Sequence, residues 1–231
     1  MLIKSALIAS GSGSVGGLTL SRNSAGMYFR ARTVPVNPAT AQQVEIRTIL
    51  GNLAAAWQTL TVAQRTAWTT YATNVPIVGK LGDPLTLTGQ QMYIRCNSAR
   101  VQAGLDRVDA GPTTYSMDSL SPVVVECTGG SPTYTVAFND EDEWVSEDSA
   151  ALLLYGSRQF APTVNFFKGP YRFAGGIDGD SVTAPTSPDA SISAPFVYTA
   201  DNHVAFRALS IRADGRISPV QFIGPQLIVS A

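Results

Sequence analysis

The chain has 231 residues, a formal net charge of −1 and 45% hydrophobic residues, enough to bury a sizeable core. Only 14% of the residues are charged, against roughly 25% in typical soluble domains. This composition excludes intrinsic disorder, which needs high charge and few apolar residues. It suits a protein whose surface packs against neighbouring molecules. No segment approaches the roughly 18 apolar residues of a membrane-spanning helix.

The near-neutral net charge hides an asymmetry. Residues 1–112 carry ten Lys or Arg and four Asp or Glu, a net charge of +6, whereas residues 113–231 carry six and thirteen, a net charge of −7. Opposite charges on the two halves indicate two modules with different surroundings. Turn-forming residues cluster at 110–112, so we predict one domain over residues 1–110 and a second over 111–231.

The first module begins with a predicted β-ribbon. Strand-like runs cover residues 2–9, 18–22 and 27–34, and a Gly/Ser-rich loop covers residues 10–17. The ribbon supplies four candidate partner-binding residues, which are Arg22, Tyr28, Arg30 and Arg32. We interpret them as a contact face for a protein partner rather than for nucleic acid, with plain solvated charge as the alternative.

Three helices follow the ribbon. Asn37-Pro38 is a typical start, and apolar residues at three- and four-residue spacing extend the first helix to about Gln58. Capping boxes then open the second and third helices, because Thr61 and Thr88 are each followed three residues later by glutamine. We expect Trp57 and Trp68 to meet in the core of a helical hairpin.

The second module consists of short strands separated by Gly, Pro, Asp and Ser clusters. Asp214-Gly215 is the strongest hairpin signal, and residues 156–195 predict extended loops with a short strand or two. The fold class is therefore α+β and mostly β, with a β-ribbon and three helices before a β-sandwich. The predicted strands cover residues 123–127, 133–138, 150–155, 196–199, 204–212 and 217–223.

Motifs for cofactors are weak. Gly11–Gly16 matches a dinucleotide-binding pattern, but a strand-like run follows it where that site needs a helix. Cys96, Cys127 and His203 are too few for a zinc site, and we expect both cysteines to be buried thiols. We therefore predict no cofactor and no metal ion.

Motifs for catalysis are equally weak. His203 heads a predicted strand without a nucleophile motif. The acidic run 140–143 lacks the glycine of a calcium loop, and Asp178-Gly179-Asp180 has the glycine but only two carboxylates. We interpret both as solvated loops and predict that the chain is not an enzyme.

Residues 20–72 resemble a family of structural proteins of tailed bacteriophages and prophages. The features that carry the resemblance are Phe29-Arg30-Ala31-Arg32, then Pro35-Val36-Asn37-Pro38, then two tryptophans with ten residues between them inside Ala54–Trp68. Family members often carry a β-sandwich after the helices. The resemblance implies a component of the virion, assembled in the host cytoplasm.

The end of the chain resembles the last hairpin of a fibronectin type III domain, a fold of the immunoglobulin-like class. The resemblance rests on residues 206–218, which read as strand, Asp-Gly turn and strand. Phe206 stands where many such domains have a tyrosine whose hydroxyl bonds to the backbone, and phenylalanine cannot make that bond. Fold similarity of this kind implies little about function.

We therefore expect a capsid decoration (cement) protein that docks on the head lattice through residues 1–110, with its acidic sandwich outward. Its partners would be the major capsid protein and further copies of itself, and neither membrane nor nucleic acid is expected. One alternative is a tail or head–tail connector component, in which the helices form a ring. A second is a host-glycan-binding module with exposed aromatic residues at Phe166, Phe167, Tyr171 and Phe173.

Overall fold

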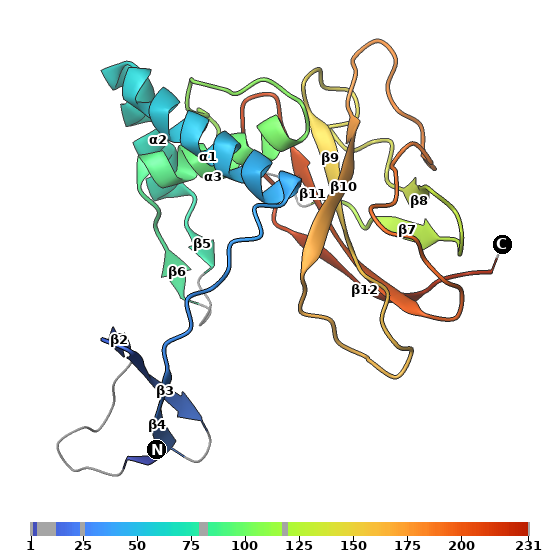
Figure 1. Cartoon of the computed structure of the whole chain (residues 1–231). Helices are drawn as coiled ribbons and strands as arrows, with labels where there is room; N and C mark the ends of the chain where they lie inside the picture. Colours follow the sequence, from blue (N-terminus) through green and yellow to red (C-terminus); the bar gives the residue numbers. More distant parts are fainter. Residues whose placement is uncertain (1, 4–12, 24–25, 79–82, 117–119, 231) are drawn as a thin grey trace. The chain divides into compact units, whose positions relative to one another are not determined.

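The computed structural model describes residues 2–3, 13–23, 26–78, 83–116 and 120–230 (Figure 1). Contacts divide the chain into two compact units, Met1–Val44 and Glu45–Ala231, here called the N-terminal unit and the main unit. The described part is mixed, with three helices and several antiparallel sheets, and it is mostly β.

The N-terminal unit is a four-stranded antiparallel sheet with the order β1-β4-β3-β2. Gly16, in the left-handed region at φ +56°, helps turn the chain from β2 into β3. The predicted Gly/Ser loop was wrong over Gly13–Val15, which form a strand, and its other predicted positions up to residue 12 lie outside the described residues. The strands are β1 (Leu2–Ile3), β2 (Gly13–Val15), β3 (Leu18–Asn23) and β4 (Gly26–Ala31).

The first helix begins later than the sequence predicts. Helix α1 covers Ala41–Thr59, so Asn37 is not its cap. Ala39 is in the left-handed region at φ +46°, which interrupts helical geometry. The side chain of Thr40 accepts a hydrogen bond from the amide of Gln43 at 3.4 Å and takes the capping role.

Both predicted capping boxes are confirmed. Thr61 and Gln64 bond reciprocally at the start of α2 (Val62–Asn74), and Thr88 and Gln91 do so at the start of α3 (Gly89–Gln102). A short two-stranded sheet of β5 (Ile77–Val78) and β6 (Pro84–Leu85) lies between these helices in the chain.

The two tryptophans pack differently from the predicted pair. The ring of Tyr93 on α3 lies 5.5 Å from both the Trp57 and the Trp68 rings, measured between centroids. Trp68 is fully buried, as predicted, whereas Trp57 is half-buried. The helical core is therefore built around an aromatic residue of the third helix.

The main unit contains a second four-stranded sheet with the order β10-β9-β11-β12, and both of its central strands are buried on both faces. Even-numbered side chains such as Leu152 and Leu154 join the core shared with β7 and β8. Odd-numbered ones such as Leu153 join a cluster with α3. The strands are β7 (Val124–Cys127), β8 (Tyr134–Ala137), β9 (Ala151–Ser157), β10 (Tyr171–Asp178), β11 (His203–Ile211) and β12 (Gln221–Leu227).

The main unit thus has three layers: helices, the four-stranded sheet, and the β7–β8 pair (Figure 1). Single β-bridges extend the β7–β8 layer toward Asp189, Ser193 and Val229. The buried Arg100 of α3 ties the helices to the sheet, donating hydrogen bonds to the carbonyl oxygens of Ser149 at 3.0 Å and Arg212 at 2.6 Å. Contacts divide the chain after residue 44, and the two domains over residues 1–110 and 111–231 stay a prediction.

Two predicted features of the second module differ in the structure. Residues 196–199 form no strand, and β12 begins at Gln221 because Ile217 makes only one bridge, to Ile211. That bridge closes the turn at Asp214-Gly215, where Gly215 has φ +92°. The eight-residue strand β10 lies in the region predicted as extended loops with a short strand or two.

Both cysteines are free and buried, as predicted. Burial raises the pKa of the Cys96 thiol to about 12 and that of Cys127 to about 11. Thiols held neutral in this way pack as small apolar side chains.

Candidate functional site

The four predicted partner-binding residues all belong to the N-terminal sheet, but they do not share one face. Pairing places Tyr28 opposite Ser21, and Arg30 opposite Thr19, so Tyr28 and Arg30 lie on the same face. Arg32 follows β4 with the same alternation, and its amide donates a hydrogen bond to the carbonyl of Gly17 at 2.8 Å. Arg22 is opposite Met27 and therefore lies on the other face.

The face that holds Tyr28 and Arg30 is polar. The hydroxyls of Ser14 and Thr19 are hydrogen-bonded to each other at 2.8 Å, and Thr19 is the cross-strand neighbour of Arg30. Arg30 and Arg32 are both exposed. This arrangement presents guanidinium donors among hydroxyl groups on a solvent-accessible sheet.

The opposite face is mostly apolar. It carries Leu18 and Leu20 from β3 beside Phe29 and Ala31 from β4. Among the described residues of this unit, Met27 alone is buried, and Leu18 remains 50% exposed. A sheet with an apolar face needs a second layer, and the described part of this unit supplies none.

All the residues of the N-terminal unit that are charged at neutral pH are cationic. Residues 1–44 contain four Lys or Arg and no Asp or Glu. The main unit carries the other twelve Lys or Arg and all seventeen Asp or Glu, a net charge of −5. The sequence contrast between halves is therefore sharper when it is drawn at the structural boundary.

The segment between the N-terminal sheet and α1 is extended and exposed. Residues 32–40 form neither helix nor strand, and Val34 and Val36 are 78% and 89% exposed. Pro35 fixes its own backbone and restricts the residue before it, which favours an extended chain.

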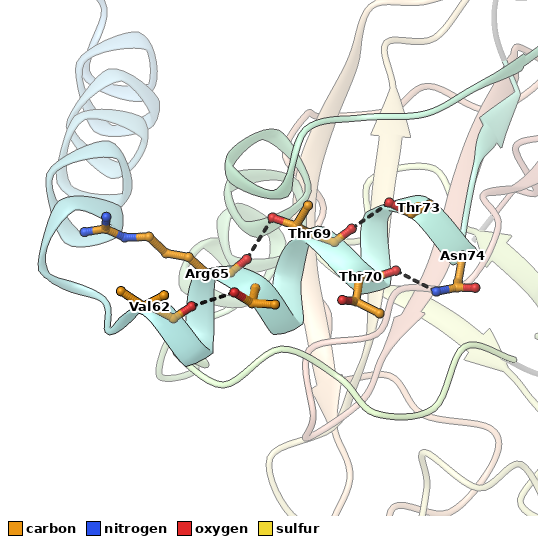
Figure 2. A pocket seen from close by; sticks show the side chains of 7 residues that line it. Val62, Arg65, Thr69, Thr70, Thr73 and Asn74 are labelled. Carbon is orange, nitrogen blue, oxygen red and sulfur yellow. Dashed lines mark hydrogen bonds between the residues drawn. The ribbon is translucent and has the colours of Figure 1, made fainter.

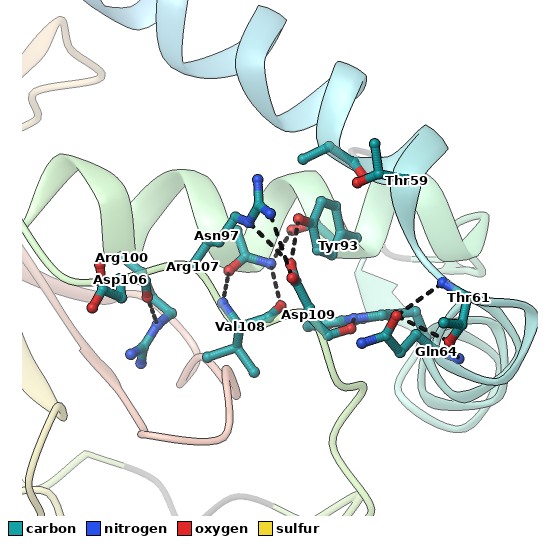
Figure 3. A network of polar contacts seen from close by, with 12 residues as sticks. Thr59, Thr61, Gln64, Tyr93, Asn97, Arg100, Asp106, Arg107, Val108 and Asp109 are labelled. Atoms are coloured by element: carbon teal, nitrogen blue, oxygen red, sulfur yellow. Dashed lines mark hydrogen bonds and ion pairs between the residues drawn. The ribbon is translucent and has the colours of Figure 1, made fainter.

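A polar network stabilises the helical layer of the main unit (Figure 3). The Trp68 indole N–H donates to the carbonyl of Asp109 at 3.0 Å, and the Tyr93 hydroxyl donates to the Asp109 carboxylate at 3.2 Å. Asn97 bonds both the amide and the carbonyl of Val108. Burial, with the nearby Asp109 carboxylate as a second cause, raises the pKa of Tyr93 to about 12. These contacts are structural, since they join α2 and α3 to the segment that follows α3.

A hollow of about 430 Å³ runs along the outer face of α2 (Figure 2). Three of its four threonine hydroxyls, those of Thr66, Thr69 and Thr73, donate to backbone carbonyls one turn earlier, for example Thr69 to Arg65 at 2.8 Å. With the hydroxyls used in this way, the hollow offers few free donors to a ligand.

A second cavity, of about 280 Å³, lies between α1, α3 and the main sheet. Ile46, Ile49 and Leu50 line it from α1, and Leu209 lines it from β11. Leu50 is 41% exposed, so the helical layer leaves an apolar opening at this point.

The acidic residues that could suggest a calcium site bond to the protein itself. Glu143 and Glu147 both pair with Arg212, which lowers the pKa of Glu143, and Asp148 accepts from the amide of Ser181 at 2.8 Å. A Cβ at Gly179 would lie 2.0 Å from the carbonyl oxygen of Trp144, so close backbone packing explains this glycine. Within the described ranges, no group of three His, Cys, Asp or Glu side chains is placed to hold a metal ion.

The other features weighed from the sequence have structural surroundings. His203 begins β11, and its ring lies edge-on to Phe160 at 6.1 Å. The Gly-rich N-terminal pattern leads through β2 into β3, so no helix follows it to hold a pyrophosphate.

Most of the aromatic residues predicted for glycan stacking pack against other side chains. Phe167 stacks on Phe160 at 4.9 Å between centroids, and the Arg207 guanidinium covers the Tyr171 ring at 4.0 Å. Phe173 packs on Tyr155 at 5.4 Å. Phe166, which is 77% exposed, is the one of the four that is classed as exposed.

A pair of arginines that the sequence did not single out meets on one ring of the main unit. Arg158 and Arg172 both lie over the ring of Phe196, with guanidinium carbons 5.2 and 5.0 Å from its centroid. A signal was present in the sequence, because residues 149–177 contain three Lys or Arg and no Asp or Glu within an otherwise acidic module.

No known protein family, curated protein or solved structure matches this chain. In the described part of the chain, no helix combines the length and the apolar character needed to cross a bilayer.

Proposed function

We propose that the protein is a structural component of a bacteriophage virion, and specifically a capsid decoration protein. It docks on the head lattice through its N-terminal module, with the face that holds Tyr28, Arg30 and Arg32 as the primary contact. In this role it acts as a binding protein rather than an enzyme, it is present in many copies per particle, and it joins the virion during assembly in the host cytoplasm.

The observation that carries this proposal is the construction of the N-terminal sheet. Its described strands bury a single side chain, Met27, and a sheet that buries so little surface gains little stability alone. Contact with a lattice would add the buried surface that this sheet lacks by itself. The absence of Asp and Glu from residues 1–44 matches an acidic partner surface.

Capsids assembled without the protein test this proposal directly. We expect the wild-type chain to bind such capsids and the double variant Arg30→Glu/Arg32→Glu to bind at least about tenfold more weakly. The matched control is Arg158→Glu/Arg172→Glu, which makes the same charge change on the main unit and should bind like wild type. Unchanged binding of the Arg30/Arg32 variant would contradict docking through this face.

Arg22→Glu sharpens the assignment of the face. Arg22 lies on the other face of the sheet from Arg30. Reversing the charge of Arg22 should therefore weaken capsid binding less than Arg30→Glu does. An equal or larger loss with Arg22→Glu would assign the contact to the apolar face.

A tail or connector ring is the second candidate, and the cavity beside α1 favours it. The partly exposed Leu50 and its neighbours Ile46 and Ile49 leave an apolar helix face that an adjacent copy could cover. Size-exclusion light scattering separates the candidates: a monomer or trimer supports decoration, and a stable ring of six or twelve supports the connector.

For the β layers of the main unit we propose a variant of the immunoglobulin-like sandwich. Two β layers enclose one core, and Phe206 packs edge-on against Tyr134 at 5.0 Å in that core. The hydroxyl of Tyr198 donates to the carbonyl of Ser157 at 2.8 Å, a tyrosine-to-backbone bond that Phe206 itself cannot make. An experimental structure with a seven-stranded Greek-key connection would support this assignment, and any other connection would refute it.

A further inference from the structure

The cations around Phe196 form a distinct arrangement on the main unit. Arg158 follows β9, and Arg172 lies on the edge strand β10 opposite Gly156. Both side chains are exposed, and both guanidinium groups lie within 5.2 Å of the centre of the Phe196 ring. Two positive charges are thereby held against one aromatic ring at the surface.

These two arginines differ from Arg212 and Arg216, which are ion-paired. Arg212 pairs with Glu143 and Glu147, and Arg216 pairs with Asp214 at 2.6 Å. Among the described residues, no carboxylate lies within ion-pair distance of Arg158 or Arg172. Arg207, which lies over the Tyr171 and Phe222 rings, likewise has no carboxylate partner among the described residues. Like charges placed close together repel, and a cation–π contact at an exposed site returns only about 0.5–1 kcal/mol. An anion between the guanidinium groups would remove the repulsion.

A cavity of about 270 Å³ adjoins the same ring. Two chain segments line it, 130–132 and 194–197, and Phe196 belongs to the lining. Hydrogen bonds fix both segments, since the amide of Gly130 donates to the carbonyl of Tyr198 at 3.0 Å and the amide of Ala194 donates to that of Pro132 at 2.7 Å. The side chains of its lining are mostly apolar, including two prolines and an exposed valine.

We propose that Arg158, Arg172 and Phe196 form a binding site for a sugar that carries a carboxylate, such as a uronic or sialic acid. The planar guanidinium groups match the two oxygens of a carboxylate, and the apolar cavity accepts the face of one sugar ring. Its volume is close to the lower end of the range for small-molecule pockets. The site uses no residue of the N-terminal sheet, so this proposal can be tested independently of the proposed docking to a capsid.

The same features argue against nucleic acid as the ligand. Nucleic acid sites follow a phosphate backbone with many cations, whereas the main unit has a net charge of −5. Single-stranded sites also need open aromatic faces for bases, and two guanidinium groups already lie over the Phe196 ring. A single carboxylate on a neutral ring fits the local charge better.

Titration of the full chain with three matched probes tests the site. D-glucuronate carries both the sugar ring and the carboxylate, D-glucose lacks the carboxylate, and acetate lacks the ring. In calorimetric or NMR titrations we expect D-glucuronate to bind at least about tenfold more tightly than either other probe. Amide resonances of Gly130 and Phe196 should shift with D-glucuronate. Equal binding of acetate, or no binding of D-glucuronate, would overturn the proposal.

Variants then assign the binding to these residues. Arg158→Met and Arg172→Met should each weaken D-glucuronate binding about tenfold or more, because each removes a charge-assisted hydrogen bond. Arg30→Met, the same substitution on the N-terminal sheet, should bind like wild type. Circular dichroism checks that each variant is folded. Wild-type affinity in the Arg158→Met/Arg172→Met double variant would refute the site.

Discussion

Strands β3 and β9 each lie inside a four-stranded antiparallel sheet, yet their surroundings differ completely. Six of the seven residues of β9 are buried, and none of the six residues of β3 is. Strand β9 packs between α3 on one face and the β7–β8 layer on the other, whereas no described layer of the N-terminal unit covers β3. The main unit therefore buries its own core, whereas the described strands of the N-terminal unit bury only Met27.

The largest expected effect comes from truncating a side chain in each sheet. Leu153→Ala should lower the free energy of unfolding by about 2–5 kcal/mol, because it opens a cavity between the sheet and α3. Leu18→Ala, at a half-exposed position of the N-terminal sheet, should cost less than about 1 kcal/mol. Urea unfolding followed by circular dichroism measures both, and equal losses would contradict the comparison.

Arg100 tests whether the helices and the sheet form one unit. Arg100→Met removes hydrogen bonds to the carbonyls of Asp106, Ser149 and Arg212. The Arg212 carbonyl still accepts from the Gly215 amide, whereas the other two lose the side-chain donor, so we expect a loss of about 3 kcal/mol. Arg107→Met is the control, since it breaks only an exposed ion pair with Asp109 and should cost under about 1 kcal/mol. Two separate unfolding transitions in the Arg100 variant would show that this side chain couples the layers. If Arg100→Met lowers the free energy of unfolding no more than Arg107→Met does, Arg100 does not hold the helices against the sheet.

Alkaline pH should weaken the main unit. Burial raises the pKa of Cys127 from 9.0 to about 11, so the folded state favours the neutral thiol. The resulting stability is complete below about pH 9 and is lost as the pH rises through about 11, up to about 2 kcal/mol. The free energy of unfolding measured from pH 8 to 11 should fall, and Cys127→Ala should flatten that slope. An unchanged slope in the variant would assign the alkaline loss to other groups.

The smallest expected effects are at the capping boxes. Thr61→Ala and Thr88→Ala should each cost about 1 kcal/mol, because each leaves a helical N–H without its acceptor. Thr66→Ala makes the same substitution inside α2, where the hydroxyl only bonds back to the carbonyl of Val62, and it should be close to neutral. Thermal unfolding measures the stability of all three variants. If Thr66→Ala destabilises the protein as much as Thr61→Ala or Thr88→Ala, the loss does not come from the helix caps.

Local signals in the sequence were sufficient to predict that the three helices and most of the strands form. The Thr-x-x-Gln spacing placed the starts of α2 and α3, because a capping box is complete within four residues. The start of α1 was misplaced by three residues, because the left-handed backbone of Ala39 has no signature in its side chain. Strand β10 contains Gly175-Gly176, which masks its pattern, and it forms by pairing with β9.

The candidate sites also combine features that the local sequence predicts with features that only the tertiary structure shows. The sequence identified Tyr28, Arg30 and Arg32 as a group, since alternate residues of one strand share a face, but only the pairing of β3 with β4 moved Arg22 to the opposite face. The sequence showed an excess of cations over residues 149–177, but not that Arg158 and Arg172 meet the ring of Phe196, because these residues are far apart in the chain.

By itself, therefore, the sequence determined the helix caps, the buried thiols, the alternation along single strands and the opposite charges of the two ends. These properties depend on residue type and on spacing within a few positions. Only the tertiary structure decided that α3 packs on β9 and β11, that the contacts divide the chain after residue 44, and that the Tyr93 ring packs against both tryptophans. Each of these depends on contacts between distant parts of the chain, which are set by shape and burial rather than by local pattern.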